Sequence, residues 1–270
     1  MHRRHTLALT LALLEKRGES GRIRSASFFT TLTDFADQGE FTPFLDDSFI
    51  DAIEQQVAED GILDSFFMSR TFSYLRANDL VYAPAIRSYM MGEAPPAFDL
   101  LYWNGDGTNL PARMAVDYLR QLCQENRFAK GEFELMGERL GLSDVKVPLC
   151  AIACEGDHIA AWPASFEGVR QMGSGDKTFI LSQSGHIAGI VNPPSKKKYG
   201  HYVSSLPLSD PESWRAAAEF QPGSWWPRWA DWLAARSEDK VPARVPGSND
   251  RPPLAPAPGI YVVGGEPEAA

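Results

Sequence analysis

Two polar motifs, each directly after a short apolar run, constrain the fold of this 270-residue chain more than any other feature. Asp157 follows an apolar run at 147–153, and His186 follows a second run at 178–181. Runs of this length are typical of buried strands in a parallel sheet. Because parallel strands end at the same edge of a sheet, the two side chains are predicted to meet there.

An acid after one strand and a histidine after the next is the order of the last two triad members in an α/β-hydrolase. In such a triad the histidine activates a nucleophile, and the carboxylate fixes the tautomer of the histidine. The nucleophile pattern G-x-S-x-G, or its cysteine equivalent, does not occur upstream. Taken singly, Asp157 could instead cap a helix, and the turn at His186 could be structural. Their joint order favours catalysis.

The remaining pattern predicts an α/β fold with a large helical insertion. The expected elements are a helix at 5–17, strands at about 24–32, 147–153 and 177–182, and helices at 161–172, 211–220 and 225–235. The predicted parts are the core at 1–35, a helical cap at 36–146, the core again at 147–236, and a flexible tail at 237–270. The aromatic-rich insertion is predicted to form a lid over the site. Four tryptophans at helical spacing, predicted to face the core, are Trp225, Trp226, Trp229 and Trp232.

The charge of the chain argues against a nucleic-acid partner, because its net charge is −9 and its pI is about 5.1. The lysine run at 196–198 is predicted to be a solvated loop, with contact to an anionic ligand as the alternative. No apolar run reaches the length of a membrane span. The stretch at 6–14 imitates a secretory signal, but charged residues at 15–17 stand where a cleavage site should be, so export is not expected.

Three cysteines, an odd number, do not form a disulfide framework, which favours a reducing cytoplasm. Cys123 and Cys154 are predicted to be packed thiols rather than substitute nucleophiles. No metal is predicted, because no standard ligand spacing is met by the four candidates Asp157, His158, His186 and His201.

Several longer motifs resemble those of class I polyhydroxyalkanoate (PHA) synthases, the bacterial enzymes that make storage polyesters. The motifs are DHIAAW at 157–162, SGHIAG at 184–189, NPP at 192–194, GSWWP at 223–227, NDLV at 78–81, PAFDLLYWNGD at 96–106 and PAPGIYV at 256–262. The likeness covers essentially all of 5–236.

The resemblance implies a partial α/β-hydrolase fold with a helical cap, and it carries the triad acid to Asp157 and the triad histidine to His186. The nucleophile of the family, a cysteine in G-x-C-x-G-G-T-L, carries over to no residue. Aligning its T-L on Thr6-Leu7 places the nucleophile at His2. We therefore expect that the match begins just after the nucleophile elbow, and that a mis-called start, a frameshift or a truncated gene explains this. Only three sheet strands are expected, with one sheet edge open and poor solubility as consequences.

The implied activity is transfer of an (R)-3-hydroxyacyl group, with 3-hydroxybutyryl expected, from coenzyme A (CoA) to a growing polyester chain. The CoA thioester is the substrate, and no further cofactor is expected. The resemblance also implies a homodimer bound at the surface of cytoplasmic polyester granules. Two alternatives remain open: an esterase or depolymerase of the same fold, and an inactive fragment that docks on granules or on an intact synthase.

Overall fold

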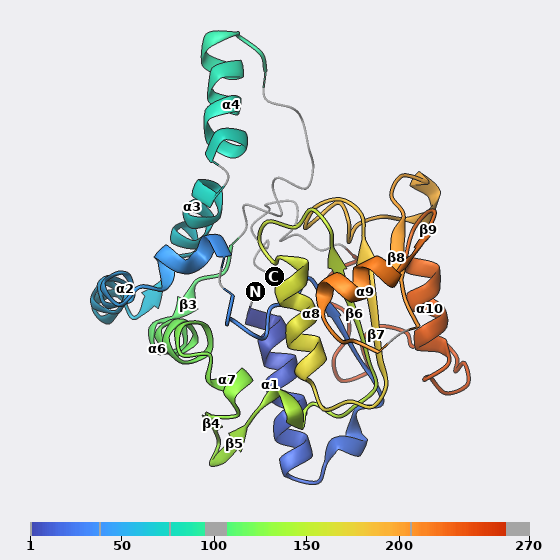
Figure 1. Ribbon diagram of the computed structural model, residues 1–270. Coiled ribbons are helices and arrows are strands. Elements are labelled where there is room, and N and C mark those ends of the chain that lie inside the picture. Colours follow the sequence, from blue (N-terminus) through green and yellow to red (C-terminus); the bar gives the residue numbers. More distant parts are fainter. Residues whose placement is uncertain (1, 38, 76, 95–106, 206, 258–270) are drawn as a thin grey trace. The chain divides into compact units, whose positions relative to one another are not determined.

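The computed structural model describes residues 2–37, 39–75, 77–94, 107–205 and 207–257. Its centre is a five-stranded sheet with the strand order β1-β6-β7-β8-β9. The strands are β1 (Ala26–Phe29), β6 (Leu149–Cys154), β7 (Lys177–Ser182), β8 (His201–Val203) and β9 (Glu219–Gln221). The first three are parallel, and β8 and β9 then pair antiparallel (Figure 1). The mixed α/β architecture is compatible with an α/β-hydrolase fold.

The predicted three strands are confirmed, but the expectation that the sheet has only three is wrong. Both additional strands, β8 and β9, are three residues long. Such short segments carry too little alternation to be recognised in the sequence. β9 also explains why the helix predicted at 211–220 is shorter, since α9 ends at Ala217. β1 is the terminal strand of the order, and within the described ranges no strand pairs with its outer edge.

β6 is buried on both faces, and its alternating side chains belong to two separate apolar clusters. Leu149 and Ala151 join the cluster that contains helix α1 (His2–Lys16), helix α8 (Trp162–Gln171) and helix α9 (Pro211–Ala217). Cys150 and Ile152 join the cluster on the other face. The period of two along a strand explains this division.

The first face is filled mainly by aliphatic side chains of α1 and by aromatic side chains of α8 and α9. Leu11 and Ala12 of α1 are buried, which confirms the predicted helix at 5–17. The Phe166 ring lies 5.7 Å from that of Trp214 and 5.0 Å from that of Phe179, measured between centroids. These contacts fix α8 and α9 against β7.

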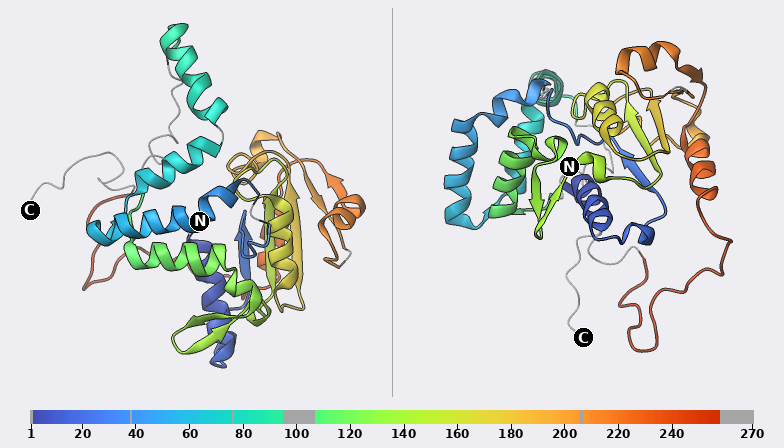
Figure 2. Two further views of the ribbon diagram at one scale, coloured as in Figure 1. Left: turned by 60° about the vertical axis from the view of Figure 1, so that its left-hand side comes forward. Right: turned by 60° about the horizontal axis from the view of Figure 1, so that its bottom comes forward.

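Helix α10 (Trp226–Ala234) covers the opposite face of the sheet (Figure 2). Trp225 is buried, and Trp226 and Trp229 are half-buried beside it. The indole nitrogen of Trp229 donates to Ser27 Oγ at 2.9 Å, which joins α10 to β1. The prediction that these tryptophans face the core is confirmed.

Most of the described part of 36–146 is helical. Its helices are α2 (Asp47–Asp60), α3 (Ser65–Leu75), α4 (Ala83–Ala85), α6 (Ala112–Asp117) and α7 (Arg127–Lys130), with π-helical segments at Asn78–Tyr82, Ile86–Met90 and Tyr118–Gln124. Two short strand pairs interrupt it, β2 (Ile62–Leu63) with β3 (Leu110–Pro111) and β4 (Phe133–Leu135) with β5 (Glu138–Leu140). Its role as a lid stays a prediction.

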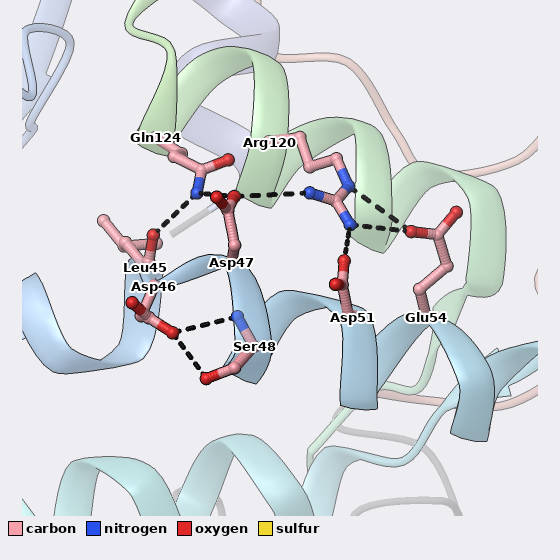
Figure 3. Close-up of polar contacts among 8 residues, drawn as sticks. All are labelled: Leu45, Asp46, Asp47, Ser48, Asp51, Glu54, Arg120 and Gln124. Atoms are coloured by element: carbon pink, nitrogen blue, oxygen red, sulfur yellow. Dashed lines mark hydrogen bonds and ion pairs between the residues drawn. The ribbon is translucent and has the colours of Figure 1, made fainter.

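Arg120 joins the segment Tyr118–Gln124 to α2 (Figure 3). Its guanidinium donates to Glu54 Oε2 at 2.9 Å and also pairs with Asp51. Gln124 extends this polar row by donating to Asp47 Oδ1 at 2.8 Å. A separate apolar cluster joins α2 to β2, β3 and α6. Its buried members are Ile53, Val57, Leu63, Leu110 and Ala115.

Several large apolar side chains of this region are exposed, among them Phe66, Tyr74, Tyr82, Tyr89 and Met90. The motif residues Phe98, Tyr102 and Trp103 lie outside the described residues. None of the helices in the described ranges is long and apolar enough to cross a membrane. The chain divides into two compact units, 1–236 and 237–270, and the described part of the second contains no helix or strand.

Candidate active site

The loops that follow β6 and β7 are hydrogen bonded to each other at the carboxyl edge of the sheet. The backbone nitrogen of Glu155 donates to Ser182 O at 2.8 Å, and that of Gly156 donates to Ser184 O at 2.9 Å. A Cβ atom added to Gly156 would lie 3.3 Å from Ser184 O, so the glycine permits this close approach. The two predicted site residues follow directly on these loops.

Asp157 and His186 form an ion pair or hydrogen bond, with Oδ2 2.7 Å from Nδ1. The other carboxylate oxygen, Oδ1, accepts from the backbone nitrogens of Ile159 at 2.8 Å and Ala160 at 2.9 Å. The Asp157 side chain is fully buried, whereas 22% of the His186 side chain is exposed. The carboxylate is therefore held from one side by the backbone while it faces the imidazole with the other.

This geometry answers the question of whether Asp157 acts only as a helix cap. The residue at the N-cap of α8 is Ala161, not Asp157. Asp157 binds local backbone groups with one oxygen and leaves the second for His186. When Nδ1–H of His186 donates to that oxygen, Nε2 is left as a proton acceptor. This contact has the geometry that the acid and base of a triad require.

The turn that carries His186 packs against the sheet through Gly189, a residue for which the sequence pattern predicted no such role. Its carbonyl oxygen accepts from Ser182 Oγ and from the indole nitrogen of Trp225, both at 2.8 Å. A Cβ atom at this position would lie 2.5 Å from Cys154 Sγ. Only glycine fits there, and the one available signal was its place at the end of the SGHIAG motif.

Two other polar residues have separate partners: the candidate ligand His201 and the buried acid Asp34. His201 Nδ1 donates to Gly223 O at 3.0 Å, and burial lowers the pKa of His201. Asp34 accepts from Asn126 Nδ2 at 2.7 Å. Across the described ranges, no group of three histidine, cysteine or acidic residues is placed to hold a metal ion.

Comparison with curated proteins identifies relatives that match almost the whole chain. Over 95% of its length, the chain is 46% identical to the poly(3-hydroxyalkanoate) polymerase of Methylorubrum extorquens. It is 43% identical to the poly(3-hydroxyalkanoate) polymerase subunit PhaC of Rhizobium meliloti and 36% identical to that of Cupriavidus necator, each over 95% of the chain. The chain belongs to the poly(3-hydroxyalkanoate) polymerase family. No family model matches the sequence.

The chain spans less than half the length of the relatives that it matches. It covers 42% of the Methylorubrum extorquens protein, 41% of the Rhizobium meliloti protein and 44% of the Cupriavidus necator protein. The resemblance seen in the sequence motifs is confirmed. The relatives are named as polymerases, which favours the transferase interpretation over the esterase or depolymerase alternative.

All three cysteines of the chain, Cys123, Cys150 and Cys154, are buried, and none of them is in a disulfide bond. Burial raises the pKa of Cys123 and of Cys150 to about 12. Cys154 is fully buried at the end of β6, where its sulfur lies beside Gly189. Because the thiolate is the reactive form, such sites are those of inert packed thiols, as predicted for Cys123 and Cys154.

Proposed function

We propose that this chain supplies the base, His186, and the acid, Asp157, of the catalytic triad in a PHA synthase. The proposed enzyme transfers (R)-3-hydroxyacyl groups, 3-hydroxybutyryl in particular, from CoA to a growing polyester chain. The observation that carries the proposal is the 2.7 Å contact between a fully buried Asp157 oxygen and His186 Nδ1. Family membership supplies the reaction class.

In the proposed mechanism, His186 Nε2 takes the proton from a cysteine thiol that belongs to the enzyme but not to the buried set described above. The thiolate attacks the thioester carbonyl, the bond to the CoA sulfur breaks, and the imidazolium returns a proton to the departing CoA thiolate. The hydroxyl of the growing chain then attacks the new acyl-enzyme thioester, and His186 again takes the proton. The acyl–sulfur bond breaks, and the released cysteine thiolate takes this proton back from the imidazolium, which regenerates the thiol. Asp157 stabilises the imidazolium at both steps.

The partners are part of the same proposal. They are the (R)-3-hydroxyacyl-CoA, the polyester chain, a second copy of the enzyme and the granule surface in the cytoplasm. Exposed apolar side chains such as Tyr89 and Met90 support contact with an apolar polymer or with a second copy. No further cofactor is proposed, because the thioester bond of the substrate already activates the acyl group.

The second candidate function is that of an inactive fragment that docks on granules or on an intact synthase. The burial of all three cysteines favours this for the 270 residues by themselves. We therefore expect that the chain expressed alone makes no polymer from 3-hydroxybutyryl-CoA. CoA release that depends on His186 in this preparation would contradict the expectation.

The two candidates are separated by a chimeric polymerase, in which this chain replaces the matching region of the Methylorubrum extorquens polymerase. If the chain carries a working acid and base, the chimera releases CoA from 3-hydroxybutyryl-CoA and makes polymer. His186→Ala should abolish both. A chimera that folds, binds granules and shows no CoA release would instead support the docking function.

A further inference from the structure

The segment between β7 and β8 holds His186 and the lysine run in one closed loop, which we call the 183–200 loop. At its base, the Gln183 backbone nitrogen donates to Gly200 O at 3.0 Å. The Gly200 nitrogen donates in return to Gln183 Oε1 at 2.9 Å. His186 lies near the start of the loop and the lysines near its end, so the two features are parts of one structural unit.

Two further contacts involve Tyr199, one from the middle of the loop and one from its start. The buried Asn192 donates from Nδ2 to Tyr199 O at 3.0 Å. Hydrogen bonding from the Ser184 side chain, together with the nearby Lys198 ammonium, lowers the pKa of Tyr199. Ser184 stands two residues before His186, and Tyr199 directly follows the lysine run. The cationic end is therefore fastened to the catalytic end.

The three lysines are available to an external anion. Lys196, Lys197 and Lys198 are exposed, as predicted, and none forms an ion pair with another described residue. Lys198 Nζ lies 5.1 Å from the centroid of the Tyr199 ring, which orders this side chain without neutralising it. On a chain with a net charge of −9, this run is a local concentration of positive charge.

The substrate of the proposed function has a matching layout. In an acyl-CoA, the reactive thioester is at one end of the pantetheine arm, and the diphosphate and 3′-phosphate lie at the other. The anionic groups therefore have to bind apart from His186 while the carbonyl lies close to the nucleophile. We propose that Lys196, Lys197 and Lys198 bind the phosphate groups of CoA and so position the thioester for the triad. This inference depends on the proposed function for its ligand.

The test measures binding by isothermal titration calorimetry to the chimeric polymerase described above, which carries His186→Ala so that no substrate is turned over. The ligands are 3-hydroxybutyryl-CoA, 3-hydroxybutyryl-pantetheine, which lacks phosphates, and adenosine 3′,5′-bisphosphate, which lacks the arm. For the double variant Lys196→Glu/Lys198→Glu, we expect the affinity for 3-hydroxybutyryl-CoA and for the bisphosphate to fall about tenfold or more, because charge-assisted contacts to phosphate are lost. Affinity for the pantetheine thioester should not change.

Two control variants accompany the double variant. Lys130→Glu reverses one lysine charge on α7, half of the charge change in the double variant, at a side chain that donates to the Glu125 carbonyl. It should keep wild-type affinity for all three ligands. Lys196→Arg/Lys198→Arg keeps the charge and should also bind CoA.

The outcomes test the phosphate assignment and the proposed acyl-CoA function separately. The phosphate assignment would be overturned, and the triad proposal left intact, if the double variant kept wild-type affinity for 3-hydroxybutyryl-CoA. The same would follow if Lys130→Glu lost as much affinity for this ligand as the double variant. If the double variant lost affinity for 3-hydroxybutyryl-pantetheine to the same extent, the lysines would act on the fold, and the phosphate assignment would also be overturned. Binding of the bisphosphate without any binding of the pantetheine thioester would instead overturn the acyl-CoA function.

Discussion

Replacing Asp157 with asparagine tests the acid–base pair most directly, because the structure assigns the two carboxylate oxygens different tasks. Oδ1 accepts from two backbone N–H groups, those of Ile159 and Ala160, and Oδ2 faces His186 Nδ1. An amide that keeps its oxygen toward the backbone presents its NH₂ to His186. The imidazole then has to accept at Nδ1 and carry its proton on Nε2, which is the wrong tautomer for a base.

The flipped amide would restore the tautomer, but it would point its NH₂ at two backbone N–H groups. Leaving each of these donors unpaired costs about 1–3 kcal/mol, or about 2–6 kcal/mol for both. The productive orientation is then populated about 30-fold to about 3 × 10⁴-fold less often. The loss of about 10⁴-fold seen when the aspartate of a serine triad is changed to asparagine lies within this range.

The assay is CoA release by the chimeric polymerase, with thermal unfolding of each variant measured in parallel. We expect Asp157→Asn to lose rate within this range while its Tm changes little, because the two side chains have the same shape. Asp144→Asn is the matched control, since Asp144 also accepts from a backbone nitrogen, that of Gly141, but pairs with Lys16. A rate for Asp157→Asn within about threefold of the parent chimera would refute the assignment of Asp157.

Three further predictions concern the turn, a buried histidine and the fold itself. Gly189→Ala should lower stability by about 1–3 kcal/mol and slow CoA release, because the new Cβ would overlap Cys154 Sγ; an unchanged urea midpoint would contradict this. Burial lowers the pKa of His201, so the unfolded chain binds the proton more readily, and stability should be complete above about pH 6.5 and fall below it. The urea midpoint should therefore drop more between pH 7.5 and pH 5.5 in the wild type than in His201→Gln, and parallel curves would show that His201 makes no contribution. Because the outer edge of β1 is unpaired in the described structure, the chain alone should aggregate or bind hydrophobic dyes, whereas a sharp monomeric transition in tryptophan fluorescence would show a self-sufficient fold.

The sequence by itself determined the strands that carry the site and the residues that follow them. Strands β6 and β7 each contain a short, compact apolar run, and the order of Asp157 and His186 behind them already predicts a common edge of the sheet. The core-facing side of α10 could also be predicted, since the spacing of its tryptophans places them on one helical face. These features are local or periodic, so neighbouring residues are enough to recognise them.

Other features were decided only by the tertiary structure, because they depend on residues far apart in the chain. β8 and β9 are too short to show a pattern and exist through pairing with β7 and with each other. The need for glycine at position 189 arises from Cys154, which lies on another strand. The closure of Gln183 on Gly200 likewise joins His186 to a lysine run that, read along the sequence, was simply a solvated loop. Contacts of this kind form only when the strands are assembled in the sheet, so the local sequence around each residue does not reveal its partner.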